Sequence, residues 1–111
     1  MNTSRNARCR MTDAESAALI SENFIDGVDN GTATVNIIIK QFPDGFPRAV
    51  SGEVRKIIDA AKAHVVNAFV AGGVEKKYID PFAEGFDVGV RQRVSEFTSE
   101  CALRTNQNYG G

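Results

Sequence analysis

The chain has 111 residues, of which 42% are hydrophobic and 24% are charged, so the composition predicts one folded domain rather than a disordered chain. Apart from three arginines near the N-terminus, ten basic residues face fourteen acidic ones. Such a body argues against non-specific binding to nucleic acid, because affinity for phosphate rises with the number of cations presented. No apolar run approaches the roughly 18 residues of a membrane span, and no apolar segment follows the basic N-terminus as in a signal peptide. We therefore expect a cytoplasmic protein with no membrane partner.

Residues 1–11 are predicted to be a basic flexible tail, because Arg5, Arg8 and Arg10 precede the first acidic residue. An alternative is that Met11 is the true start, which would leave residues 1–10 without a function. A single α+β domain is expected over residues 12–104. The polar segment 105–111 ends in two glycines and is expected to be a flexible C-terminal tail.

A first helix is predicted to begin at Thr12, because Thr12 and Glu15 have the spacing of a capping box. In that motif the threonine hydroxyl accepts from the amide of the glutamate, whose side chain reaches back to the threonine amide. The apolar residues that follow are mostly alanines and form a narrow stripe. We expect this helix to pack lightly, or against another chain.

A β-hairpin turn is predicted at Asn30-Gly31, the residue pair that most favours a type I′ turn. Residues 32–42 then alternate like a strand, with Ala33, Val35, Ile37 and Ile39 expected on one buried face and Ile38 as the exception. The segment 24–28 is either the partner strand or the end of the first helix.

Two further helices are predicted in the second half of the chain. One runs from about residue 50 to residue 71 and ends at Gly72-Gly73, with a core stripe of Val50, Val54, Ile57, Ile58, Ala61, Val65, Ala68 and Phe69. The segment 74–79 is either a short edge strand or a loop. The other helix is expected to begin at Asp80-Pro81, as N-cap and first residue. Its stripe is Phe82, Phe86, Val90, Val94, Phe97 and Cys101.

The glycines at positions 85 and 89 lie inside this last helix, where small residues allow another backbone to approach closely. The predicted fold class is thus α+β, a short antiparallel hairpin or sheet with two longer amphipathic helices, in the order α-β-β-α-(β)-α. An isolated hairpin is marginal in water, so helices or a second subunit must cover its apolar face. We therefore expect a homodimer.

Motifs for catalysis are missing from the sequence. There is one histidine, His64, and the two cysteines, Cys9 and Cys101, have no zinc-ligand spacing, so both are expected to be reduced. No phosphate-binding loop or nucleophile elbow is present. We predict a non-enzymatic protein with no catalytic residues, no metal and no cofactor, in which His64 is structural or on the surface.

Two groups of residues are the candidate binding sites. Phe42 and Phe46 flank a turn and could anchor a protein partner, together with Arg91 and Arg93. Lys76, Lys77, Arg91 and Arg93 could surround an anion. Because residues two apart diverge by about 200° on a helix, both arginines would reach one ligand only in a dimer.

The predicted function is a small homo-oligomeric interaction module that binds and modulates a larger cytoplasmic protein, as an inhibitor or adaptor. The alternative is a binder of a small anion, such as a nucleotide, at a subunit interface. Nucleic-acid binding is a third hypothesis. The net charge opposes it, and so does the joint of about eight residues between the last two helices, which is too long for a helix-turn-helix.

Overall fold

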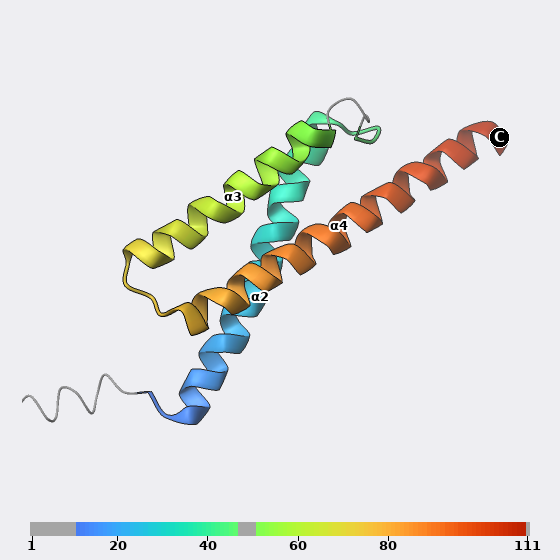
Figure 1. Cartoon of the computed structure of the whole chain (residues 1–111). Coiled ribbons are helices and arrows are strands. Elements are labelled where there is room, and N and C mark those ends of the chain that lie inside the picture. Colours follow the sequence, from blue (N-terminus) through green and yellow to red (C-terminus); the bar gives the residue numbers. More distant parts are fainter. Residues whose placement is uncertain (1–10, 47–50, 111) are drawn as a thin grey trace, which may run out of the picture.

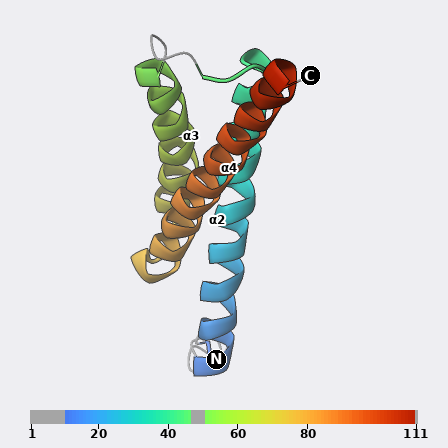
Figure 2. The same ribbon diagram turned by 90° about the vertical axis from the view of Figure 1, so that its right-hand side faces the viewer.

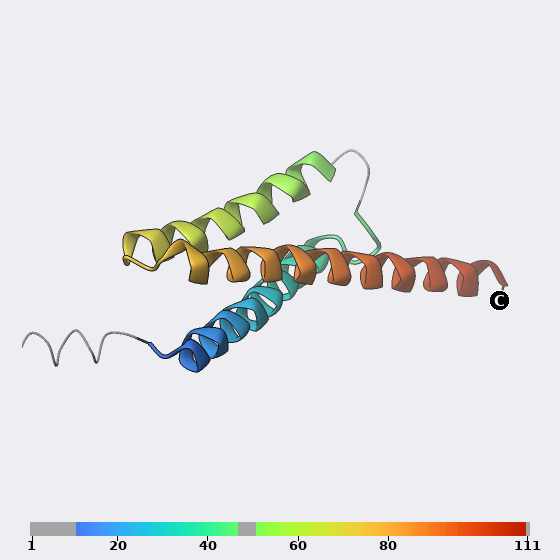
Figure 3. The same ribbon diagram turned by 60° about the horizontal axis from the view of Figure 1, so that its bottom comes forward.

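The computed structural model describes residues 11–46 and 51–110, which form three α-helices, α2 (Asp13–Gln41), α3 (Ser51–Ala71) and α4 (Lys76–Gly110) (Figure 1). α4 crosses the molecule from the lower end of α3 to the upper end of α2 (Figure 2). α3 runs back along α4 in the opposite direction (Figure 3). At 35 residues, α4 is about 50 Å long, because an α-helix rises about 1.5 Å per residue.

The helices α2 and α4 are parallel. Residue numbers rise together along their contact: the Asn23 amide donates to the Tyr78 carbonyl oxygen, and Arg93 Nε donates to Asn36 Oδ1. Two parallel helices in one chain need a segment that returns to the starting end. α3 is that segment, so its position follows from the pairing of the other two.

Glycines on both helices make this contact close. A Cβ atom on Gly27 or Gly31 would overlap the carbonyl oxygen of Phe82 or Phe86, and one on Gly85 or Gly89 would overlap a carbonyl oxygen of α2. Both pairs are spaced by four residues, so the i±4n ridges of the two helices meet. This packing class brings helix axes together at about −50°, and small residues let the backbones touch.

The hydrophobic core lies beside this glycine contact. Phe82 and Phe86 are 2% and 1% exposed, and α2 and α3 add smaller aliphatic residues around them. The Phe69 ring meets the Phe82 ring edge to face, with 5.2 Å between centroids. The buried residues of this cluster are Val35, Ile38, Val54, Ile58, Phe82, Phe86 and Val90.

The predicted α+β fold is wrong, because residues 13–41 form one helix and the described residues contain no strand. Asn30-Gly31 is not a turn. Gly31 is buried against α4, and the Asn30 side chain donates to the Asp26 carbonyl oxygen four residues earlier. Gly31 therefore serves helix packing, a role that its local sequence does not reveal.

The predicted strand faces are also wrong. Val35 and Ile38 are 0% and 1% exposed, whereas Ile37, expected on the buried face, is 61% exposed. Gly31, Val35, Ile38 and Phe42 follow the helical spacing of four, three and four. A β-branched residue in a helix costs at most about 0.7 kcal/mol, whereas burying its side chain contributes about 1.5–3 kcal/mol. Tertiary burial therefore outweighs strand propensity here.

The start of α4 differs from the prediction as well. The helix begins at Lys76 and contains Pro81, so residues 76–79 are helical rather than an edge strand, and Asp80 is not its N-cap. Tyr78 and Ile79 are 7% and 6% exposed, which extends the apolar stripe by one turn. Pro81 is the sixth residue of the helix, so it removes the amide that would donate to the Lys77 carbonyl oxygen, a loss that is costly inside a helix. Burial of these two side chains explains the early start.

Several local predictions are confirmed. Glu15 N donates to Thr12 Oγ1 over 3.1 Å, and Thr12 N donates to Glu15 Oε1 over 3.3 Å, which completes the capping box. α3 ends at Ala71, and Gly73 has a φ of 78° after it. In the predicted stripe of α3, Ile57 is 45% exposed and Ala68 is exposed, while Val50 lies outside the described residues. The predicted stripe of α4 is buried or half-buried throughout.

The structure describes residues 105–110 of the predicted C-terminal tail but not residues 1–10 of the predicted N-terminal tail. Residues 105–110, expected to be flexible, belong to α4. The N-terminal prediction falls on residues 1–10, which lie outside the described residues, as does Cys9. Within the described ranges, no helix combines the length and the low polarity that crossing a lipid bilayer requires.

Because the helices touch at these glycines, we expect one added methyl group to have a large effect on stability. Gly27→Ala is expected to lower the free energy of unfolding by about 2 kcal/mol or more, because overpacking against a fixed backbone is costly. Gly52→Ala is the matched control, since nothing lies within 4 Å of its added Cβ. The control is expected to stay within about 1 kcal/mol of the parent, on the stabilising side. Urea unfolding followed by circular dichroism measures both, and equal values would contradict the close contact.

Neighbouring isoleucines provide a test of the helical register. Ile38→Ala is expected to lower the free energy of unfolding by about 2–5 kcal/mol, whereas Ile37→Ala, at an exposed position, should change it by less than about 1 kcal/mol. The same urea titration applies. A larger loss of unfolding free energy in Ile37→Ala than in Ile38→Ala would contradict the helical register and support the predicted strand.

Candidate functional site

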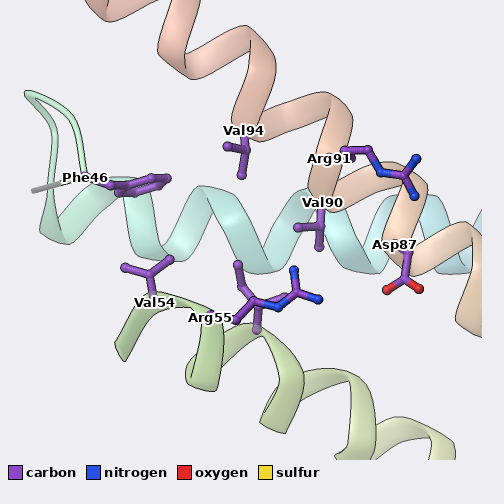
Figure 4. Close-up of a pocket in the computed structure, with 8 residues that line it drawn as sticks. Phe46, Val54, Arg55, Asp87, Val90, Arg91 and Val94 are labelled. Carbon is purple, nitrogen blue, oxygen red and sulfur yellow. The ribbon is translucent and has the colours of Figure 1, made fainter. Parts of the chain in front are cut away.

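A cleft between α3 and α4 is the candidate site (Figure 4). Its volume is about 330 Å³, and it is lined by Phe46, Val54, Arg55, Ile58, Asp87, Val90, Arg91 and Val94. At the other end of α3, the Phe69 ring fills the space against Phe82. At the cleft, the described residues that α3 contributes to the buried core are Val54 and Ile58, both smaller than phenylalanine.

The floor of the cleft is apolar. Val54, Ile58 and Val90 line the cleft and are each 6–7% exposed. Phe46 closes one end, and its ring is held 5.0 Å from the ring of Phe97. Such a floor favours an apolar ligand, since burying hydrocarbon contributes about 25 cal/mol per Å².

The rim of the cleft is charged. Arg55 Nε lies 3.3 Å from Asp59 Oδ1 on its own helix. Lys62 Nζ donates to both carboxylate oxygens of Asp87, over 3.0 Å each, and so joins α3 to α4. Within the described part of the chain, no carboxylate lies within ion-pair distance of Arg91. The guanidinium of Arg91 is therefore available to a ligand.

This arrangement suits a small amphipathic anion. An arginine fork binds carboxylate or phosphate oxygens with two parallel hydrogen bonds. The cleft volume is at the lower end of the range for small-molecule sites. An apolar body would lie on the floor while its anionic group reached the rim beside Arg91.

Of the predicted partner-binding residues, Arg91 and Phe46 lie at the cleft. Phe42 is half-buried and packs edge to face against Phe46, with 6.3 Å between ring centroids, so this pair fills space at the end of the bundle. Arg93 faces α2 instead. It donates from Nε to Asn36 Oδ1 over 2.7 Å and from Nη1 to Glu100 Oε1 over 3.0 Å, and thereby links the parallel helices.

The predicted anion-binding set does not come together. Lys76 lies 3.6 Å from Asp80, and Lys77 lies 3.8 Å from Glu75 and over the ring of Tyr78. Both lysines stand on the first turn of α4, and Arg91 follows fifteen residues later on the same helix. That spacing is about 22 Å along the axis, too far for one small ligand within one chain.

His64 and Cys101 lie away from the cleft lining among the described residues. His64 is exposed on α3. Cys101 is half-buried, and Arg104 Nη2 donates to its sulfur over 3.1 Å. Across residues 11–46 and 51–110, no group of three His, Cys, Asp or Glu side chains could hold a metal ion.

Sequence reasoning missed Arg55, Lys62 and Asp87 as site residues. Arg55 and Lys62 are not members of the predicted core stripe of their helix, and that alone does not reveal a rim. The one signal present is the four-residue spacing of Asp87 and Arg91, which places both on one face of α4. The opposing residues on α3 become visible only once the two helices are paired.

No family model, curated protein or solved structure matches this chain.

Proposed function

We propose that this chain is a small helical binding protein whose cleft between α3 and α4 holds an apolar molecule with one anionic group. The observation that carries the proposal is Arg91, a guanidinium with no carboxylate at ion-pair distance among the described residues, at the edge of an apolar floor. A medium-chain fatty carboxylate has this chemistry. Its hydrocarbon chain would contact Val54, Ile58 and Val90, and its carboxylate would accept from Arg91.

The charge of the rim supports an anion over a cation. Around the rim, the three basic side chains of Arg55, Lys62 and Arg91 outnumber the two carboxylates of Asp59 and Asp87, each of which is paired with Arg55 or Lys62. The excess positive charge sits beside a low-dielectric floor, where a charge-assisted hydrogen bond is stronger than in open water.

Binding without chemical conversion is part of the proposal. The described lining residues include no His, Cys, Ser, Thr or Tyr, which are common acids, bases and nucleophiles of enzymes. The one carboxylate in the cleft, Asp87, is held by Lys62 on both oxygens. These features favour a carrier or sensor of the ligand over a catalyst.

The proposal modifies the anion-binding hypothesis drawn from the sequence. It keeps Arg91 and places the site within one chain rather than between subunits. It leaves Lys76, Lys77 and Arg93 outside the site, since each has a partner of its own.

Decanoate at neutral pH is the probe that tests this function, with decanol as its uncharged analogue. Isothermal titration calorimetry is expected to show one decanoate bound per chain, more tightly than decanol. Arg91→Gln should weaken decanoate binding about tenfold or more, because a hydrogen bond to a charged group contributes about 1.5–3 kcal/mol. The control Lys76→Gln removes the same charge from the same helix, about 22 Å away, and should bind like the parent. Absence of binding, or equal affinity in Arg91→Gln, would contradict the proposal.

Self-association and binding to a larger protein stay predictions. Large apolar side chains are exposed on all three helices, and Ile37, Val70 and Leu103 are each 61% exposed. Light scattering after size-exclusion chromatography is expected to show twice the 12.0 kDa of one chain at high protein concentration. A constant single-chain mass across concentrations would exclude the dimer.

A further inference from the structure

We infer that Lys62 sets the charge preference of the cleft by holding Asp87 away from Arg91. The inference rests on the proposed function, and it assigns a specificity role to a residue that the ligand itself need not touch. Lys62 is therefore a positioning residue, acting through Asp87 on the availability of Arg91.

Asp87 and Arg91 are natural partners. They lie four residues apart on α4, and an acid and an arginine at this spacing form ion pairs on helix surfaces. In this structure they are not paired. Both oxygens of Asp87 instead accept from Lys62 on α3, over 3.0 Å each.

Lys62 and Arg91 compete for one carboxylate, that of Asp87. Arg55, the other arginine of the rim, lies beside Asp59, which is its i+4 neighbour on α3. The side chains of Lys62 and Asp87 are 30% and 47% exposed, so their pair is partly shielded from solvent. Arg91 is therefore available to a ligand as long as Asp87 pairs with Lys62 instead.

Removal of Lys62 has a predictable consequence. Asp87 would lose its partner and turn to Arg91, one helical turn away. The rim would then have two basic and two acidic residues, and a ligand carboxylate would compete with Asp87 for Arg91. Anion affinity would fall although no residue of the apolar floor had changed.

A double substitution distinguishes a Lys62 that positions Asp87 from a Lys62 that only holds α3 against α4. Lys62→Met is expected to weaken decanoate binding about tenfold in calorimetry, with decanol binding unchanged. Lys62→Met combined with Asp87→Asn also lacks the ion pair between the helices, yet it frees Arg91, so its decanoate affinity should return to within about threefold of the parent. Lys56→Met, an exposed lysine beside Glu53 on α3, is the control and should bind like the parent. If the double variant is as weak as Lys62→Met, Lys62 only attaches α3 and the inference is overturned.

A measurement on the protein without ligand distinguishes a failure of this inference from a failure of the proposed function. The NMR signal of the Arg91 Nε–H group is expected to shift in Lys62→Met, as Asp87 pairs with it, and to return in the double variant. An unshifted signal in Lys62→Met would overturn the inference whatever the parent binds. A shifted signal in a protein that does not bind decanoate would keep the Lys62–Asp87–Arg91 relation and reject only the proposed ligand.

Discussion

The backbone contact between α2 and α4 is the constraint on which the rest of this structure depends. Gly27 and Gly31 on one helix and Gly85 and Gly89 on the other remove the side chains that would separate the axes. The contact fixes the two helices as a parallel pair, and a parallel pair in one chain requires a returning helix. α3 takes that role and packs through its buried residues Val54 and Ile58 and through partly buried residues that include Phe69. The cleft lies between α3 and α4 beside Val54 and Ile58.

The chemistry of the cleft follows from which helix supplies each charge. α4 carries Asp87 and Arg91 one turn apart, an arrangement that would neutralise itself on an isolated helix. α3 brings Lys62 to Asp87, and the two residues form the ion pair that joins α3 to α4 within the described residues. The same pair thus serves both packing and electrostatics, since it holds the returning helix and leaves one guanidinium available above an apolar floor.

Part of this fold could be predicted from the sequence and part could not. The capping box at Thr12, the end of α3 at Gly72-Gly73 and the stripe of phenylalanines in α4 depend on near neighbours, and these predictions are confirmed. Asn30-Gly31 and the β-branched run after it also have a strong local preference, for a turn and a strand, but burial against α4 outweighs it. The sequence predicts close backbone approach at Gly85 and Gly89, whereas it predicts a turn at Gly31 and places Gly27 in a segment that is either a strand or the end of the first helix. For the site, Arg91 and Phe46 were named in advance, while Lys62 and Asp87 depend on the pairing of helices far apart in sequence.

The location of a bound ligand is the most direct test of the central claim that α3 and α4 enclose a binding cleft. Isotope-filtered NMR of the protein with decanoate would detect contacts between the ligand chain and protein methyl groups. We expect contacts to Val54, Ile58 and Val90, which line the cleft. Contacts confined to Ile20 and Ile25, which line a separate hollow between α2 and α4, would contradict the claim, as would the absence of any contact at saturating decanoate.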